Sequence, residues 1–216
     1  MRRLVARRLR EMDPAERARR DAVLIGRALD HPWIRDLPAG AVVFGYAPLP
    51  DEPDLGDLWR ALLASGRRTA FPRWLSEAPE HDSRPLLTFH ETRSPPPGFA
   101  DPRAGAEWEK TLHAVWAPVA AMPEMPLSAA ALVVVPGRAF APGGWRLGRG
   151  LGCYDRWLVR LDSRTPTLAA AYDEQIFDEV PRAGCDHPLS AWFTPTRSWP
   201  EPCLWSFGLL SPKSRR

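Results

Sequence analysis

The sequence predicts an α/β fold in which helices cover both faces of a mostly parallel sheet, giving three layers. Residues 41–46, 54–65 and 69–71 have the patterns of a strand, a helix and a strand, which together make a parallel βαβ unit. Residues 132–135 form an apolar run without polar alternation, which is typical of a strand buried on both faces of such a sheet.

Two helices are predicted to precede the βαβ unit. Residues 2–11 combine an apolar side with an arginine-rich side, as in a helix that packs with one face. Asp13 is placed to cap a second helix over residues 14–29, because a proline follows it at the first helical position. Pro32 is expected to end that helix.

The βαβ unit is bounded by loop and cap signals. The β-branched and aromatic run 41–46 is followed by an acidic, proline-rich loop over residues 47–53. Asp54 is placed to cap the helix that follows, and Gly66 is placed to end it.

The middle of the chain has a weaker pattern. Residues 77–126 lack a clear period and contain a proline cluster at 95–97, so we predict an irregular, partly exposed excursion. Within it, only residues 85–89 and 111–116 resemble strands.

The second half returns to a regular alternation. The buried strand 132–135 is followed by a glycine-rich loop at 136–152 and a helix at 154–161. Two further strands are predicted at 166–172 and 189–194.

Composition limits the class of protein. The chain has 216 residues, which suits one domain, predicted over residues 1–198, followed by a proline-rich, basic tail over residues 199–216. The net charge of +3 gives no indication of nucleic-acid binding, and no apolar run approaches the ~20 residues of a membrane helix. Three cysteines without a CxxC motif indicate neither a disulfide framework nor a zinc site. We expect a monomeric cytoplasmic protein without nucleic-acid or membrane partners.

The glycine-rich loop is a candidate phosphate site. Gly148, Gly150 and Gly152 alternate along it, and backbone N–H groups in such a loop can converge on one anion. Arg146 and Arg149 add permanent cations that suit phosphate oxygens. The spacing matches neither a Walker A loop nor a Rossmann fingerprint.

Asp155 follows this loop at the point where a carboxylate could hold Mg²⁺ against bound phosphates. The alternative interpretation is a glycine-rich turn followed by a surface Asp-Arg pair, Asp155 and Arg156. The wider pattern favours the phosphate site, because Pro136-Gly137 and Tyr154 stand in register with the glycines.

This wider pattern is also that of a known family. Pro136-Gly137-x-Ala139-Phe140, followed by Arg146-Leu147-Gly148-x-Gly150-x-Gly152-x-Tyr154-Asp155-Arg156, resembles the signature of the 5-formyltetrahydrofolate cyclo-ligases. Weaker matches occur in the family's order at Arg8 to Met12, Glu16-Arg17, Tyr46 to Asp54, Phe71 to Arg73 and Pro181 to Pro188.

The resemblance implies a fold and a reaction. The fold would be similar to the ribose-phosphate isomerase and CoA-transferase superfold. The reaction would be the conversion of 5-formyltetrahydrofolate, with or without a polyglutamate tail, to 5,10-methenyltetrahydrofolate, using ATP and Mg²⁺ and releasing ADP and phosphate. Two alternatives stay open: a paralog of the same fold with another substrate, and a non-catalytic nucleotide-binding module.

The resemblance also implies site residues. ATP is expected to contact Arg2, Arg146, Leu147, Gly148, Arg149, Gly150, Leu151, Gly152, Cys153 and Tyr154. The folate is expected to contact Ala47, Glu52, Arg149, Gly150, Leu151, Gly152 and Cys153. Arg149 and Tyr154 are the expected catalytic residues, and Asp155 and Asp186 are the expected Mg²⁺ ligands.

The chain departs from the family pattern in three places. A lysine usually precedes the arginine that matches Arg2, so either an upstream start supplies it or Arg3 and Arg7 substitute. Cys153 stands where an aromatic residue is usual, and residues 95–126 match poorly. Beside these, Trp74 and Trp116 are candidate walls for a pterin ring.

Overall fold

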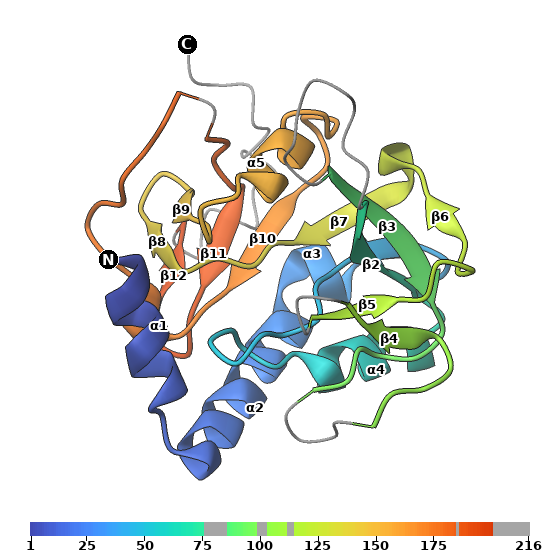
Figure 1. Cartoon of the computed structure of the whole chain (residues 1–216), viewed down its shortest axis with the longest axis horizontal. Helices are drawn as coiled ribbons and strands as arrows, with labels where there is room; N and C mark the ends of the chain where they lie inside the picture. The colour runs from blue at the N-terminus through green and yellow to red at the C-terminus, as the bar shows by residue number, and fades with distance from the viewer. Residues whose placement is uncertain (76–85, 99–102, 112–114, 185, 201–216) are drawn as a thin grey trace.

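The computed structural model describes residues 1–75, 86–98, 103–111, 115–184 and 186–200. Within them, one eight-stranded sheet lies at the centre, in the order β12-β11-β10-β7-β1-β2-β3-β6 (Figure 1). Its middle strands are parallel: β11 (Ala191–Phe193), β10 (Thr167–Ala170), β7 (Ala130–Val134), β1 (Val42–Phe44) and β2 (Arg68–Leu75). The mostly parallel sheet predicted from the sequence is therefore confirmed.

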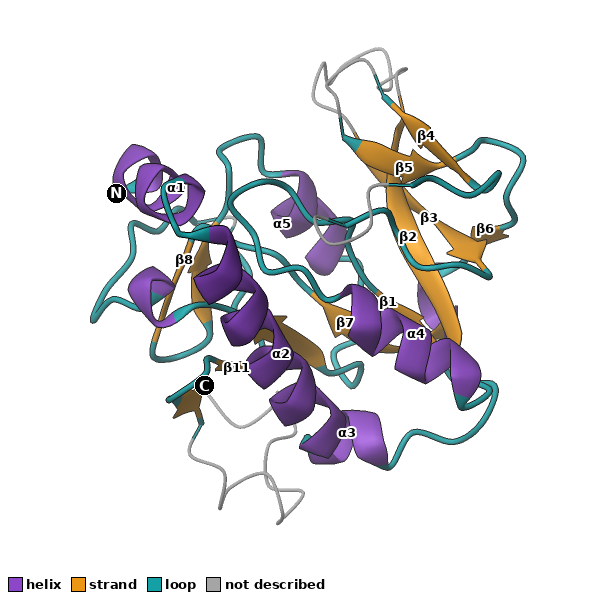
Figure 2. Ribbon diagram, turned by 90° about the horizontal axis from the view of Figure 1, so that it is seen from below, coloured by secondary structure: helices purple, strands orange, loops and turns teal. Residues whose placement is uncertain are grey.

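Helices cover both faces of this sheet. The helices α1 (Arg2–Arg10), α2 (Pro14–Asp30), α3 (Pro32–Arg35) and α4 (Gly56–Ala64) pack in one apolar cluster with one face, on which α2, α3 and α4 lie side by side (Figure 2). The helix α5 (Cys153–Leu158) belongs to a second cluster. Successive residues of β1 face opposite sides, because Val43 joins the first cluster whereas Val42 and Phe44 join the second. The result is three layers.

The βαβ unit forms as predicted. β1 and β2 pair in parallel, with Val42 opposite Arg68, and α4 lies between them in the chain. The Oδ1 atom of Asp54 accepts a hydrogen bond from the N–H of Gly56 at 3.0 Å. Gly66 has φ +78° just past the helix, a conformation that side chains other than glycine rarely adopt.

The N-terminal region forms three helices, not two. Asp13 caps α2 as predicted, because its Oδ1 atom accepts the N–H groups of Ala15 and Glu16, each at 3.0 Å. Pro32 ends α2 but also begins α3, since proline suits a first helical position. The Nδ1 atom of His31 caps this short helix, accepting the N–H of Trp33 at 3.2 Å.

The prediction of an irregular excursion over residues 77–126 holds only in part of the described residues, because the strand predicted within it at 85–89 is confirmed and further strands are present. β3 (Leu86–Thr92) pairs antiparallel with β2, and β6 (Glu124–Met125) pairs with β3. A separate ribbon pairs β4 (Trp108–Lys110) with β5 (Trp116–Pro118), in place of the strand predicted at 111–116, of which 112–114 lie outside the described residues. Strands of two or three residues are too short to show a period, so only their partners reveal them.

The glycine-rich loop also contains unpredicted structure. β8 (Ala139–Ala141) and β9 (Trp145–Leu147) form a hairpin. Its turn requires Gly144, which has φ +77°, and a Cβ atom there would lie 2.0 Å from the carbonyl oxygen of Leu189. The hairpin therefore fixes where the second half of the loop leaves the sheet.

The end of the chain is only partly described. β12 (Ser198–Trp199) pairs antiparallel with β11 and closes one edge of the sheet. The predicted boundary at residue 198 falls inside this strand, and residues 201–216 lie outside the described part, so the division into domain and tail stays a prediction. No helix in the described ranges is long and apolar enough to cross a membrane.

A buried carboxyl group joins α2 to the sheet. Asp21 is 7% exposed, and its Oδ1 atom accepts a hydrogen bond from the hydroxyl of Tyr172, which follows β10, at 2.5 Å. Burial raises the pKa of Asp21 to about 7, and the hydrogen bond from Tyr172 opposes this shift. The folded protein therefore holds a proton on Asp21 at pH values where the unfolded chain has lost it.

The pKa of Asp21 makes stability depend on pH. Because its folded pKa lies above the unfolded value, the free energy of unfolding should fall as pH rises from about 4 to about 7 and then level off. Asp21→Asn keeps an acceptor for Tyr172 and removes the titration. Relative to the wild type, this variant should gain about 2 kcal/mol between pH 5 and pH 8, which is several degrees in the unfolding temperature. A difference that is equal at both pH values would contradict the assignment.

Candidate active site

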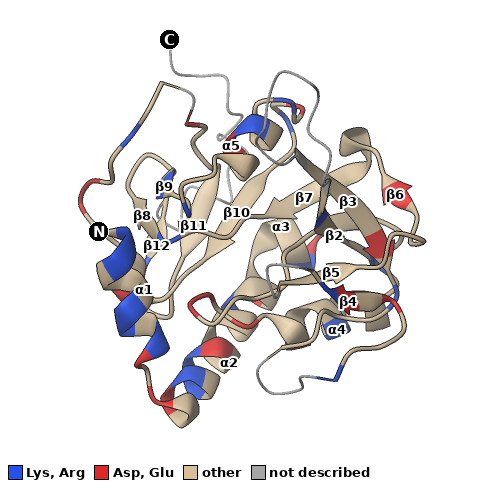
Figure 3. Cartoon of the chain, viewed as in Figure 1, with Lys and Arg blue, Asp and Glu red and all other residues tan. Residues whose placement is uncertain are grey.

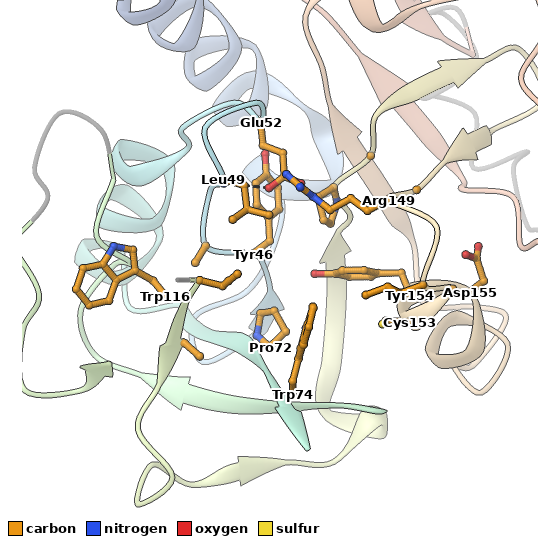
Figure 4. Close-up of a pocket in the computed structure, with 18 of the residues that line it drawn as sticks. Tyr46, Leu49, Glu52, Pro72, Trp74, Trp116, Arg149, Cys153, Tyr154 and Asp155 are labelled. Atoms are coloured by element: carbon orange, nitrogen blue, oxygen red, sulfur yellow. Dashed lines mark hydrogen bonds and ion pairs between the residues drawn. The ribbon is translucent and has the colours of Figure 1, made fainter. Parts of the chain in front are cut away.

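One pocket lies at the carboxyl ends of β1, β2 and β7 (Figure 4). The acidic loop after β1 contributes Tyr46, Ala47, Leu49 and Glu52 to one side. The glycine loop contributes the opposite side, from Arg146, Gly148, Arg149 and the run Leu151 to Asp155. In open α/β sheets, ligands bind at this end of the strands, where loops from neighbouring strands face one another.

The part of the glycine loop that follows β9 contains two left-handed residues. Gly150 has φ +112° and Gly152 has φ +64°, and Gly152 is the residue that precedes α5. Open space surrounds the Cβ position of Gly150, so the backbone conformation, and not packing, requires glycine there. From α1, the Nε atom of Arg2 donates to the carbonyl oxygen of Gly148 at 2.9 Å. Figure 3 shows the cations of α1 on the same side of the molecule as β8 and β9.

Arg146 lies beneath the pocket and is paired. Its side chain is 2% exposed, and its Nη2 atom lies 2.8 Å from Oδ1 of Asp155. Its guanidinium carbon lies 5.7 Å from the ring centre of Tyr154, which gives a cation–π contact. Burial lowers the pKa of Arg146, and the charge of Asp155 opposes that shift. Arg146 therefore holds the side chains of both Tyr154 and Asp155 in place.

Tyr154 points its hydroxyl into the pocket (Figure 4). That hydroxyl is buried and has no hydrogen-bond partner among the described residues. Burial raises the pKa of Tyr154, and the negative charge of Glu52 raises it further. The hydroxyl thus stays protonated at neutral pH and can donate a hydrogen bond to a ligand.

Two arginines meet the acidic loop. The Nε atom of Arg149 lies 3.3 Å from Oε1 of Glu52, and its Nη2 atom pairs with Asp51. Asp51 is fully buried and also pairs with Arg138, which lies just before β8. Burial raises the pKa of Glu52, and the charge of Arg149 opposes the shift. The sequence analysis identified Glu52 and Arg149 but missed Asp51 and Arg138.

An aromatic wall completes the pocket opposite the glycine loop. Trp74 extends from β2 and Trp116 from β5, so both tryptophans suggested by the sequence line the pocket. Arg73 holds the two strands together, because its Nη1 atom donates to the carbonyl oxygen of Pro118 at 2.7 Å and pairs with Glu109. Further lining comes from residues that were not predicted to contact a ligand: Pro72, Thr111, Val115, Ala117, Pro136 and Gly137.

Four of the predicted residues lie outside the pocket lining. Leu147 is 4% exposed, pairs with Ala139 between β8 and β9 and packs in the apolar cluster of the hairpin. Arg2, Gly150 and Asp186 are not among the residues that line the pocket.

Cys153 lines the pocket as a half-buried free thiol. Burial raises its pKa, which keeps it protonated and makes it a poor nucleophile. Cys185 and Cys203 lie outside the described residues.

One of the two predicted metal ligands is paired with a guanidinium group. Oδ1 of Asp155 lies 2.8 Å from Nη2 of Arg146, and the charge of Asp186 also raises the pKa of Arg146. Oδ2 of Asp186 accepts the N–H of Ala183 at 2.7 Å, which leaves its other oxygen for a ligand. Within the described ranges no three metal-ligating side chains gather in one place. Mg²⁺ needs only one or two protein carboxylates when phosphates and water complete its shell, so this donor set fits the ion.

Comparison with known proteins gives one consistent result. The model of the 5-formyltetrahydrofolate cyclo-ligase family matches residues 1–195. The 5-formyltetrahydrofolate cyclo-ligase of Mycolicibacterium smegmatis is 28% identical over 166 residues, which are 76% of this chain and 79% of that protein. The Escherichia coli K12 protein of the same name is 37% identical over 76 residues, which are 35% of this chain and 42% of that protein.

Two solved structures share the fold. The 5,10-methenyltetrahydrofolate synthetase of Aquifex aeolicus superposes with a TM-score of 0.71 at 23% identity, covering 91% of this chain and 89% of its own. The 5,10-methenyltetrahydrofolate synthetase of Mycoplasma pneumoniae gives a TM-score of 0.68 at 16% identity, covering 90% and 96%. The α/β architecture with a large, mostly parallel sheet is therefore that of these proteins.

Proposed function

The chain belongs to the 5-formyltetrahydrofolate cyclo-ligase family, and on that premise we propose that its pocket converts 5-formyltetrahydrofolate to 5,10-methenyltetrahydrofolate, with ATP consumed and ADP and phosphate released. Family membership makes the chain a ligase and removes the non-catalytic nucleotide-binding module as an alternative. The observation that carries the proposal is the single pocket with a cationic, glycine-rich side and an acidic and aromatic side.

The glycine-rich side suits the phosphates of ATP. The backbone between Gly148 and Gly152 borders the pocket, and Arg149 extends from it with 36% of its side chain exposed. Exposed backbone N–H groups and a planar guanidinium are good partners for phosphate oxygens. Arg2 supports this loop from α1 through its hydrogen bond to the carbonyl oxygen of Gly148.

The opposite side suits the folate. The carboxylate of Glu52 is 95% buried, and the amino and ring N–H groups of a pterin are natural partners for such a group. Ala47 lies beside it, and Trp74 and Trp116 give flat apolar surfaces for the rings. The reactive formyl group would then lie between the two sides, near Cys153 and Tyr154.

The reaction needs positioning more than a protein nucleophile. The formyl oxygen is a poor leaving group, so its attack on the γ-phosphorus of ATP, with ADP leaving, turns it into a phosphate ester. N10 then bonds to the formyl carbon and loses its proton to water, the C–O bond breaks and phosphate leaves, which gives the methenyl bridge. Arg149 would neutralise charge on the transferred group, and Tyr154 would orient the substrate by donating a hydrogen bond from its hydroxyl. Arg146 would act from below, by fixing Tyr154 and Asp155.

Asp155 and Asp186 are the residues that would hold Mg²⁺. When bound, the ion would neutralise phosphate charge during the transfer. Asp155 is paired with Arg146 through one oxygen, and its second oxygen is available. We further propose that the enzyme acts in the cytoplasm as a monomer, without nucleic-acid or membrane partners.

A direct assay tests this function. Mixing the protein with ATP and 5-formyltetrahydrofolate should produce the near-ultraviolet absorbance of the conjugated methenyl product, and omission of ATP or Mg²⁺ should abolish it. ATP hydrolysis or binding without this product would instead favour a paralog with another substrate. Absence of both would contradict the proposed ATP site.

A further inference from the structure

Three ion pairs link four charged side chains in a row, of which Glu52 and Arg149 line the pocket. Two carboxylates, Asp51 and Glu52, meet two guanidinium groups, Arg138 and Arg149. Asp51 pairs with both arginines, whereas Glu52 pairs with Arg149 alone, at 3.3 Å. The second oxygen of Glu52 accepts the N–H of Leu49 at 3.1 Å. The two negative and two positive charges sum to zero, but the two carboxylates have different partners.

Asp51 and Arg138 are the two buried members of this group. Asp51 is fully buried and the side chain of Arg138 is 9% exposed. Burial and the positive charges of Arg149 and Arg10 lower the pKa of Arg138 to about 10. An arginine in such surroundings requires a counterion, because an uncompensated buried charge is strongly unfavourable. Asp51 is that counterion, and the next carboxylate along the loop is Glu52.

We propose that Asp51 is a positioning residue that keeps Glu52 available to the folate. Asp51 neutralises Arg138 and pairs with Nη2 of Arg149. Glu52 is then left with a single ion pair, to Nε of Arg149 at 3.3 Å. The incoming substrate can replace that contact. This inference rests on the proposed function of Glu52 as the group that binds the pterin.

The consequence follows from charge balance. Without the negative charge of Asp51, Arg138 loses its counterion and Arg149 keeps Glu52 as its one paired carboxylate. The N–H groups of the substrate would then compete with Arg149 for the oxygens of Glu52, beside the uncompensated positive charge of Arg138. Folate affinity should fall more than ATP affinity, because the phosphates are expected to bind the backbone of the glycine loop as well as Arg149.

The test measures binding and kinetics in charge-matched variants. Asp51→Asn should raise the dissociation constant of 5-formyltetrahydrofolate, measured by calorimetry without ATP, about fivefold. The KM for ATP, to which the backbone of the glycine loop also contributes, should rise by a smaller factor. The double variant Asp51→Asn/Arg138→Gln removes the unpaired cation as well, so its folate affinity should return to within twofold of the wild type. Asp57→Asn, a change of the same charge on the exposed surface of α4, should alter none of these values.

Each outcome decides the question. Unchanged folate affinity in Asp51→Asn, or equal weakening of folate and ATP without recovery in the double variant, overturns the inference. If Asp51→Asn does not fold, the charge-balanced double variant decides, since a fivefold loss of folate affinity there contradicts the proposal. Glu52→Gln is measured in parallel. If it binds folate like the wild type, the proposed role of Glu52 fails, whereas a loss in Glu52→Gln without one in Asp51→Asn rejects only the role of Asp51.

Discussion

Glu52→Gln is expected to raise the dissociation constant of 5-formyltetrahydrofolate by roughly ten- to a hundredfold, with little effect on ATP. A hydrogen bond to a charged partner contributes about 1.5–3 kcal/mol, and Gln keeps the shape of Glu52 while removing the charge. Calorimetric titrations with each ligand measure the two affinities. Arg149 keeps its pairing with Asp51 in this variant, so the glycine loop should stay in place.

The pH dependence gives a second measure of the same group. Burial raises the pKa of Glu52, so folate affinity in the wild type should fall as pH drops toward that pKa, and Glu52→Gln should lack this dependence. Glu179→Gln, an exposed change of the same chemistry, is the control. Equal losses of folate and ATP affinity in Glu52→Gln would count against a contact with the pterin.

Asp155→Asn is expected to lower turnover at least tenfold, which corresponds to about 1.4 kcal/mol of transition-state stabilisation. The carboxylate would hold Mg²⁺ near the transferred phosphoryl group, so part of the lost activity should return at high Mg²⁺. Asp186→Asn should act in the same direction. The double variant should lose less than the product of the two single effects, because both groups serve one ion. Steady-state kinetics across a Mg²⁺ series measure all three variants.

A loss of activity in Asp155→Asn has a competing explanation, which is the loss of the ion pair between Asp155 and Arg146. Arg146 is buried, so Asp155→Asn also removes its counterion and should reduce stability. Activity is therefore expressed per folded molecule, from thermal unfolding of the same samples. A loss of stability with an unchanged Mg²⁺ dependence would make Asp155 structural. The exposed Asp178→Asn is the charge-matched control.

The parts of the fold that the sequence predicts are those with local signals. Asp13 and Pro14 mark the start of α2, and Gly66 marks the end of α4, because caps and left-handed residues act on their own helix. The strands β4, β5 and β6 are two or three residues long and depend on partners elsewhere in the chain. The partner of β6 lies far away in β3, so no short window of the sequence indicates that pairing.

The residues of the site are likewise predictable only where they are neighbours in the sequence. The glycine loop is recognisable because its residues are neighbours in the chain, from Arg146 to Asp155. Asp51 stands next to Glu52 in the sequence, and nothing local indicates that it is buried against Arg138. The sequence suggests Trp74 and Trp116 as walls of the pocket, but no local pattern indicates that β2 packs against the β4–β5 ribbon and so brings them together.

The contacts between distant segments also determine when the site can exist. Arg2 reaches the glycine loop across 146 residues of chain, and Arg149 reaches Glu52 across 97. Closing loops of that length costs entropy before any contact compensates, so the pocket should form late during folding. It should also disappear together with the rest of the tertiary structure, without a binding-competent intermediate. In a denaturant titration, the loss of folate binding should therefore coincide with the global unfolding transition.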